Sequence, residues 1–399
     1  MARYTASRRT ALKVLGGTVA SGGAALTSLG GGVSAAASEG RTGRIPEELK
    51  PGGTLDRLAA DLASKDEFSG SLRLTYRRKP VLARSYGMAD KKTGVRNGME
   101  TRFGLGSISK MFTAVSVHSL VQQGKVNYTD KLGAHLDGFP AHIADKVTIH
   151  HMFTHSSGLG DFHNLPGYRE ASKTWDSADE VLNGTVEFIR KMDLAFEPGA
   201  GSTYSNAAYC LLGAIVAAVS GRSYYDYVKE HVFDAAHMRD SDFLTKPEWR
   251  ADPQAAHCYY KRRGESEWTD SLEEHPYIQL PAGGSFATCA DMERFAHHLL
   301  EDDLLDAPYT SMMLNPKIPN PNAGSETTFR TMKFAGYGSL TRLSNDQWIY
   351  GHGGGSTLGT SAHFDVYPGS GWVVVVLSNY PDKAADPIAD LARDVILQQ

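Results

Sequence analysis

Two residues near the start of an apolar stretch could form and break an acyl bond. In Phe103-Gly-Leu-Gly-Ser107-Ile-Ser-Lys110, a serine and a lysine stand three positions apart. On a helix, residues at this spacing lie on the same face, and a helix N-terminus favours developing negative charge. A serine needs a proton acceptor to attack a carbonyl carbon, and a lysine can assist. Alone, this pattern has little weight, because four-residue patterns often arise by chance.

A second segment brings a phenol and an amide together. Glu197-Pro-Gly-Ala-Gly-Ser-Thr-Tyr204-Ser-Asn206 places Tyr204 and Asn206 two positions apart, directly before an apolar stretch. A loop at this point could direct both side chains at one cavity. The alternative is that Tyr204 packs beneath the loop while Asn206 only caps the following helix.

A third segment, Gly351-His352-Gly-Gly-Gly355, lies between two predicted strands. Backbone without side chains lets a ligand approach a sheet closely. The Gly355 N–H together with the Ser107 N–H could form an oxyanion hole, in which each donor contributes a factor of about 10²–10³ to the rate. The alternative is a glycine-rich loop with a hydrogen-bonded histidine.

In this order, the three segments resemble those of the serine β-lactamase and D-Ala-D-Ala peptidase superfamily. The resemblance is strongest to its class C-like branch, which contains esterases, D-aminopeptidases and low-molecular-weight penicillin-binding proteins. Residues 148–159 (TIHHMFTHSSGL) and 280–285 (LPAGGS) are also similar to that branch. The resemblance extends from Leu55 to the C-terminus.

The resemblance implies a role for each residue of the first two segments. Ser107 would be the nucleophile and Lys110 its proton partner. Tyr204 would act as the base in acylation and as the acid for the leaving group, and Asn206 would hold Lys110 and the substrate. Which of Lys110 and Tyr204 holds the proton is not a question that the sequence answers.

For the third segment, the resemblance implies substrate and oxyanion contacts by His352, Gly354 and Gly355. His352 stands where β-lactamases have a lysine that helps to clamp the substrate carboxylate. A histidine with its ordinary pKa near 6.5 is mostly neutral at pH 7, and no hydroxyl-bearing residue follows before Ser356. We therefore expect an esterase, or a peptidase or amidase acting on substrates without a terminal carboxylate.

Alternative functions remain open within the same superfamily. They are a D-Ala-D-Ala carboxypeptidase or penicillin-binding protein, a weak β-lactamase, and a non-catalytic penicillin-binding-like sensor. An arginine elsewhere could also supply the carboxylate clamp. We expect no metal and no cofactor, and a small-molecule or peptide substrate.

The pattern of apolar residues predicts the elements that position these segments. Strands are predicted at 69–76, 81–86, 336–343, 347–350, 361–367 and 371–378. Helices are predicted at 55–62, 108–123, 206–220, 291–300 and 385–397. The expected fold is α+β: an antiparallel sheet built from the N- and C-terminal segments and flanked by helices, with an inserted, mainly helical lobe.

The expected organisation has three parts. Residues 1–37 resemble a twin-arginine export signal, with Arg8 and Arg9 before a weakly apolar stretch; an ordinary secretory signal or a retained anchor is the alternative. Residues 38–54 are a predicted linker. Residues 55–399 form the predicted hydrolase domain, with a sheet lobe (55–105 and 300–399) and a helical lobe (about 106–299). The expected location is secreted or periplasmic, without a stable membrane span in the mature protein.

Composition argues against other classes of protein. The formal net charge of −4 disfavours nucleic acid as a partner. The sequence contains no G-x-S-x-G pattern, which argues against a different serine hydrolase fold. A metal hydrolase is the main rival, because His150, His151, His155 and His163 cluster near Asp161, although without an H-E-x-x-H pattern. The three cysteines (Cys210, Cys258 and Cys289) are interpreted as buried apolar residues, with one disulfide possible in an exported protein.

Overall fold

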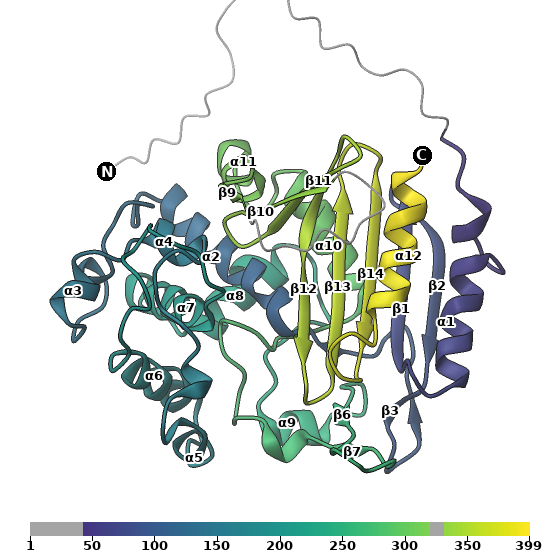
Figure 1. The fold of residues 1–399 in the computed structure, drawn as a ribbon, viewed down its shortest axis with the longest axis horizontal. Coiled ribbons are helices and arrows are strands. Elements are labelled where there is room, and N and C mark those ends of the chain that lie inside the picture. The colour runs from purple at the N-terminus through teal and green to yellow at the C-terminus, as the bar shows by residue number, and fades with distance from the viewer. Residues whose placement is uncertain (1–42, 320–330) are drawn as a thin grey trace, which may run out of the picture. The chain divides into compact units, whose positions relative to one another are not determined.

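An eight-stranded antiparallel sheet is the centre of the computed structural model, which describes residues 43–319 and 331–399 (Figure 1). The strand order is β2-β1-β14-β13-β12-β11-β10-β9. The strands are β1 (Gly70–Tyr76), β2 (Lys79–Tyr86), β9 (Ile318–Pro319), β10 (Thr331–Ala335), β11 (Leu340–Ser344), β12 (Gln347–Ser356), β13 (Thr360–Tyr367) and β14 (Trp372–Ser378). Since β1 pairs with β14 from Gly70↔Ser378 to Tyr76↔Trp372, N- and C-terminal segments share one sheet. The predicted α+β fold is confirmed, whereas the predicted export signal lies outside the described residues.

Helices cover both faces of the sheet (Figure 1). They are α1 (Thr54–Ser64), α2 (Ser109–Gln122), α3 (Ala141–Ala144), α4 (Ile149–Phe153), α5 (Tyr168–Ser172), α6 (Ala178–Ile189), α7 (Asn206–Ser220), α8 (Tyr224–Val228), α9 (Lys246–Ala251), α10 (Cys289–Leu300), α11 (Ala307–Leu314) and α12 (Asp386–Leu397). Short 3-10 turns lie at Glu47–Leu49, Gly106–Ile108, Leu132–Ala134, Phe162–Asn164 and Leu272–Glu274, and a π-helical turn lies at Lys229–Asp234. Two-stranded pairs join β3 (Met88–Asp90) to β4 (Val95–Arg96), β5 (Phe103–Gly104) to β8 (Phe286–Ala287), and β6 (Tyr259–Tyr260) to β7 (Thr269–Asp270).

Strand β14 shows why this sheet needs helices on both sides. Its residues are all buried, and they alternate between two apolar cores. Trp372, Val374 and Val376 join the core formed with α1 and α12, whereas Val373 and Val375 face the core that contains α2, α7 and α10. Because successive strand residues point to opposite faces, a continuous apolar run is what a strand covered on both faces requires.

Helices α2 and α7 form the centre of the helical side. Every residue of α2 from Ser109 to His118 is buried, and α7 is buried from Ala207 to Val216. A helix that is apolar around most of its circumference belongs in a core. The reactive ends of both helices are therefore held by extensive packing.

Two predicted boundaries differ from the structure at the C-terminal strands. Residues 336–339 form a turn between β10 and β11 rather than the start of a strand. Strand β12 does not end at Tyr350 but continues through the glycines to Ser356, pairing Gly353 with His363 and Gly355 with Ser361. The glycine segment is thus part of the sheet and not a loop, because the backbone pairs with β13 without needing side chains.

Within the described residues, no single helix has the length and apolar character needed to cross a membrane. Asn206–Ser220 and Tyr224–Asp234 meet those criteria only as a pair, and their axes are bent by 85°.

Candidate active site

Ser107 lies in a 3-10 turn that leads directly into α2. The turn spans Gly106–Ile108, and Gly106 has φ +52°, a conformation that favours glycine. A Cβ atom on Gly106 would also lie 3.0 Å from Gly355 N. In the first turn of a helix, backbone N–H groups have no intrahelical acceptor, so the Ser107 N–H is placed at a helix start beside β12.

Lys110, the second residue of α2, is fully buried, and its side-chain nitrogen has three acceptors. Nζ donates to Ser107 Oγ at 3.1 Å, to Asn206 Oδ1 at 2.9 Å and to the Ala282 carbonyl oxygen. It also lies 4.8 Å from the ring centroid of Tyr204 and 5.5 Å from that of Tyr209. Buried ammonium groups need such partners, and here they fix the amine beside the seryl hydroxyl.

Tyr204 completes the cluster from the segment before α7. Its hydroxyl donates to Ser107 Oγ at 2.6 Å. The N-cap of α7 is Ser205, whose hydroxyl accepts from Ala208 N at 3.0 Å. The helix begins at Asn206 as predicted, but the alternative in which Asn206 serves only as its cap is wrong, because Ser205 is the cap and the amide oxygen of Asn206 accepts from Lys110.

The third segment approaches Ser107 through its backbone. A Cβ atom on Gly354 would lie 2.0 Å from Leu105 O and 3.1 Å from Ser107 N, and one on Gly355 would lie 2.1 Å from Asp382 Oδ1. Only glycine fits at these two positions without a shift of the neighbouring atoms. This close approach brings the backbone at Gly355 beside the N-terminus of α2.

His352, for which the resemblance implied a contact with the substrate, is buried in β12. Its ring is 5% exposed, and Nδ1 donates to the Gly353 carbonyl oxygen. Burial, together with the charge of Lys110, lowers the pKa of His352 to about 3. The imidazole is therefore neutral at physiological pH and supplies no cation for a substrate carboxylate.

A cavity of about 480 Å³ opens at this cluster. The described residues that line it include Ser107, Asn206 and Gly355. They do not include His352 and Gly354. Aromatic and apolar side chains form much of the remaining wall, namely Phe162, Tyr168, Trp249, Leu280, Phe286 and Leu358. The volume and the mixed lining are those of a site for a small organic substrate.

Charged side chains gather on the cavity wall at α5. Arg169 lines the cavity from this helix, Lys173 lines it from the position directly after the helix, and Glu274 lines it from the 3-10 turn Leu272–Glu274. Arg169 is paired with Glu274 at 3.2 Å, and both groups retain solvent contact. Arg169 and Lys173 are the cationic part of the wall, and no pattern in the sequence indicated that they lie near Ser107.

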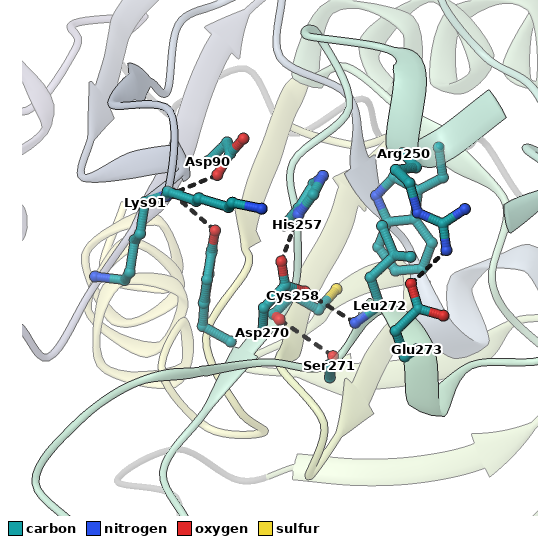
Figure 2. A network of polar contacts seen from close by, with 12 residues as sticks. Asp90, Lys91, Arg250, His257, Cys258, Asp270, Ser271, Leu272 and Glu273 are labelled. Carbon is teal, nitrogen blue, oxygen red and sulfur yellow. Dashed lines mark hydrogen bonds and ion pairs between the residues drawn. The ribbon is translucent and has the colours of Figure 1, made fainter. Parts of the chain in front are cut away.

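A polar network supports the part of the wall around Cys258 and Leu358, and Figure 2 shows it at close range. His257 Nδ1 bonds to Asp270 Oδ2 at 2.6 Å, and the Ser271 hydroxyl donates to the Cys258 carbonyl oxygen at 3.1 Å. The same hydroxyl lies 2.6 Å from the carbonyl oxygen of Leu358. Because Cys258 and Leu358 both line the cavity, this network fixes the shape of its wall.

The histidines considered as metal ligands have separate partners. His150 bonds to the Tyr337 hydroxyl at 2.7 Å, His151 caps the start of α4, and His163 pairs with Asp161 at 2.6 Å. His155 accepts from Ser205 N at 3.1 Å. In residues 43–319 and 331–399, no three His, Cys, Asp or Glu side chains are grouped as a metal site would require.

The three cysteines are unpaired thiols in the interior. Cys210, Cys258 and Cys289 are all buried and form no disulfide. Burial raises the pKa of each thiol to about 12. Their interpretation as buried apolar residues is confirmed.

Two contacts of the cluster were not predicted from the sequence. The Ala282 carbonyl is a backbone group in a segment that was noted only for its resemblance, so no residue type could reveal it. Tyr209 stands three residues after Asn206 on α7, and this helical spacing would have placed both on the face towards Lys110.

The fold and this serine–lysine–tyrosine cluster define the serine β-lactamase and transpeptidase class. The Beta-lactamase family model matches residues 55–398, and the chain belongs to this family.

Its relatives include proteins with several named activities. The chain is 31% identical over 274 residues to penicillin-binding protein 4* of Bacillus subtilis (strain 168), covering 66% of this chain and 59% of that protein. It is 32% identical over 211 residues to esterase EstB of Burkholderia gladioli, covering 50% and 53% of the two chains. The match to the B. subtilis putative penicillin-binding protein PbpX covers 61% of that protein, so the chain spans about three fifths of these two B. subtilis relatives.

Solved structures agree with the fold. The crystal structure of a penicillin-binding protein from Bacillus halodurans superposes with a TM-score of 0.71 at 27% identity, covering 84% of this chain and 98% of that one. A D-amino acid amidase from Ochrobactrum anthropi SV3 superposes with a TM-score of 0.69, covering 86% and 98% at 21% identity. The second likeness shows the fold alone.

Proposed function

We propose that this protein is a serine hydrolase that forms an acyl-enzyme on Ser107. The observation that carries the proposal is the pair of contacts at one atom: Tyr204 Oη at 2.6 Å and Lys110 Nζ at 3.1 Å from Ser107 Oγ. A hydroxyl with two proton-transfer groups in hydrogen-bond reach has the arrangement of an activated nucleophile.

The reaction that fits these contacts has two steps. Ser107 Oγ bonds to the substrate carbonyl carbon as the seryl proton passes to the Lys110–Tyr204 pair, in which one of the two groups is deprotonated before the step. The pair then returns a proton to the departing alcohol or amine. Water then attacks the acyl-enzyme and gives up a proton to the same pair, which protonates Ser107 as the acid leaves. In both steps, the N–H groups of Ser107 and Gly355 would stabilise the negative oxygen of the intermediate.

We infer further that the substrates are esters or amides without a carboxylate next to the reacting bond. A buried His352 with a pKa of about 3 leaves no positive charge at the place of the carboxylate clamp. The cationic side chains of the wall lie elsewhere, Arg169 on α5 and Lys173 directly after it. This arrangement supports hydrolysis of short-chain esters or amino-acid amides over efficient β-lactam hydrolysis.

A hydrolysis panel tests both parts of the proposal. We would measure kcat/KM for p-nitrophenyl acetate and butyrate, D-amino-acid amides, a D-Ala-D-Ala peptide and a chromogenic cephalosporin. Ser107→Ala should abolish every activity, whereas Ser119→Ala, on the same helix, should retain it. Cephalosporin turnover more efficient than ester turnover would refute the substrate preference, and activity in Ser107→Ala would refute the mechanism.

A further inference from the structure

His155 holds the backbone on both sides of Tyr204. Its carbonyl oxygen accepts from Thr203 N at 2.9 Å, and its ring Nδ1 accepts from Ser205 N at 3.1 Å. The His155 ring also lies against the Tyr204 ring, with centroids 4.6 Å apart and planes inclined by 33°. One residue thus contacts the segment before, at and after the tyrosine.

Tyr204 needs such support because it is not enclosed by the core. The residue is 45% exposed, although its hydroxyl lies only 2.6 Å from Ser107 Oγ. An exposed side chain loses rotamer freedom when it is held in one orientation, and displacement of a reacting group by about 1 Å can cost a factor of about 100 in rate. The buried His155 ring, 7% exposed, provides a fixed surface for the phenol.

The backbone of His155 shows that this position is strongly determined. His155 has φ +56°, in the left-handed region that a residue with a side chain enters only when its surroundings hold it there. This conformation turns the chain after α4, so that the carbonyl and the ring of the same residue both face residues 203–205. Strained backbone of this kind is often found beside functional groups.

The ring can make its contact only in one protonation state. Nδ1 must be unprotonated to accept from Ser205 N–H, so the neutral ring carries its proton on Nε2. The groups that face the His155 ring are Lys110 on α2, His352 on β12, Tyr204 before α7 and Tyr209 on α7. The ring centroids of His155 and Tyr209 are 5.2 Å apart. Burial, together with the charge of Lys110, keeps the pKa of His155 well below 6.5.

We propose that His155 is a positioning residue for the reaction, because its Nδ1–Ser205 hydrogen bond and its ring contact hold the Tyr204 hydroxyl against Ser107. This proposal rests on the proposed function, in which Tyr204 transfers protons. It assigns to His155 a contribution to kcat that passes through Tyr204 alone, without contact with substrate.

Two substitutions separate the two contacts. His155→Phe keeps an aromatic ring beside Tyr204 but removes the acceptor, whereas His155→Asn keeps an acceptor, tolerates a positive φ and removes the ring. We expect kcat for p-nitrophenyl butyrate to fall by a factor of about 10–100 in His155→Phe and by less in His155→Asn, with KM changed by less than a factor of about three. The matched control is His150→Asn in α4, since His150 bonds to Tyr337 and not to residues 203–205.

A double-mutant cycle with Tyr204→Phe provides the decisive measurement, with all rates normalised to serine titrated by a fluorophosphonate. If His155 acts through Tyr204, adding His155→Phe to Tyr204→Phe should lower kcat by less than a factor of about two. An equal loss in both backgrounds, or a higher KM with unchanged kcat, would overturn the inference. If Tyr204→Phe itself retains full kcat, the proposed function fails instead, so the two failures are distinguishable.

Discussion

The substitution Gly354→Ala tests the packing of β12 against the N-terminus of α2. The added Cβ atom would lie 2.0 Å from Leu105 O, about 1.4 Å short of an ordinary van der Waals contact, and 3.1 Å from Ser107 N. Both neighbours are backbone atoms, so no flexible side chain can move aside. The strand must shift away from Ser107 by about 1 Å, and the Gly355 N–H moves with it.

The expected loss follows from the oxyanion donors. Removal of one such donor costs a factor of about 10²–10³ in kcat, or roughly 2.7–4 kcal/mol of transition-state stabilisation. Overpacking should cost about 1–3 kcal/mol in the free energy of unfolding as well. We therefore expect a folded Gly354→Ala protein whose kcat for p-nitrophenyl butyrate is at least about 100-fold lower.

The neighbouring glycine supplies a matched control. A Cβ atom on Gly353 would meet only Ala362 O, at 3.7 Å, which is an ordinary contact. Gly353→Ala should therefore retain kcat within a factor of about three, by the usual small effect of an unstrained substitution. Steady-state kinetics per titratable serine and urea denaturation of both variants are the assays. Equal kcat in the two variants would refute the role of the Gly354 contact in placing the oxyanion donors.

Three further substitutions test the electrostatics of the fold. His352→Lys should lower the melting temperature without creating cephalosporin turnover, because the new amine enters a buried position near Lys110; a gain of cephalosporinase activity would contradict this. Asp365→Asn removes the buried carboxylate shared by two partly buried arginines and should cost about 3–5 kcal/mol in urea unfolding, whereas Asp390→Asn, at an exposed position, should cost under about 1 kcal/mol. His257 is partly buried, which disfavours its charge, but Asp270 outweighs this effect and raises the pKa of His257. A raised pKa means that the protonated His257 stabilises the fold at low pH, and that this contribution disappears as the pH rises through the pKa of the folded state. The substitution His257→Gln should therefore reduce the free energy of unfolding more at pH 6 than at pH 9. The opposite trend would contradict the ion pair.

The sequence predicted most of the sheet because its strands follow simple rules. The Val-rich run at 371–378 is the strand β14, buried on both faces, and it pairs with the strand predicted at 69–76. Helix α7 was predicted with its observed bounds, Asn206–Ser220, because Gly221 ends it in a left-handed conformation. An apolar run and a glycine after the last turn of a helix are local properties of the sequence, so they can be recognised without knowledge of the tertiary structure.

The parts that escaped prediction depend on contacts between distant segments. Glycines in β12 weaken a strand signal, and only pairing with β13 shows that Gly351–Gly355 is a strand. His155 looked like a possible metal ligand, whereas its ring supports Tyr204, 49 positions away in the sequence. Likewise, the burial of His352 and the place of Arg169 and Lys173 on the cavity wall follow from tertiary packing alone.

The most direct test of the central claim is to trap the acyl group on the serine. Wild-type protein would be mixed with p-nitrophenyl butyrate, quenched in acid within milliseconds, and analysed by intact mass and peptide mapping. We predict one butyryl group, on the peptide that contains Ser107, together with a burst of one p-nitrophenol per active site. Hydrolysis at the wild-type rate in Ser107→Ala, or an acyl group that maps to another residue, would contradict the account.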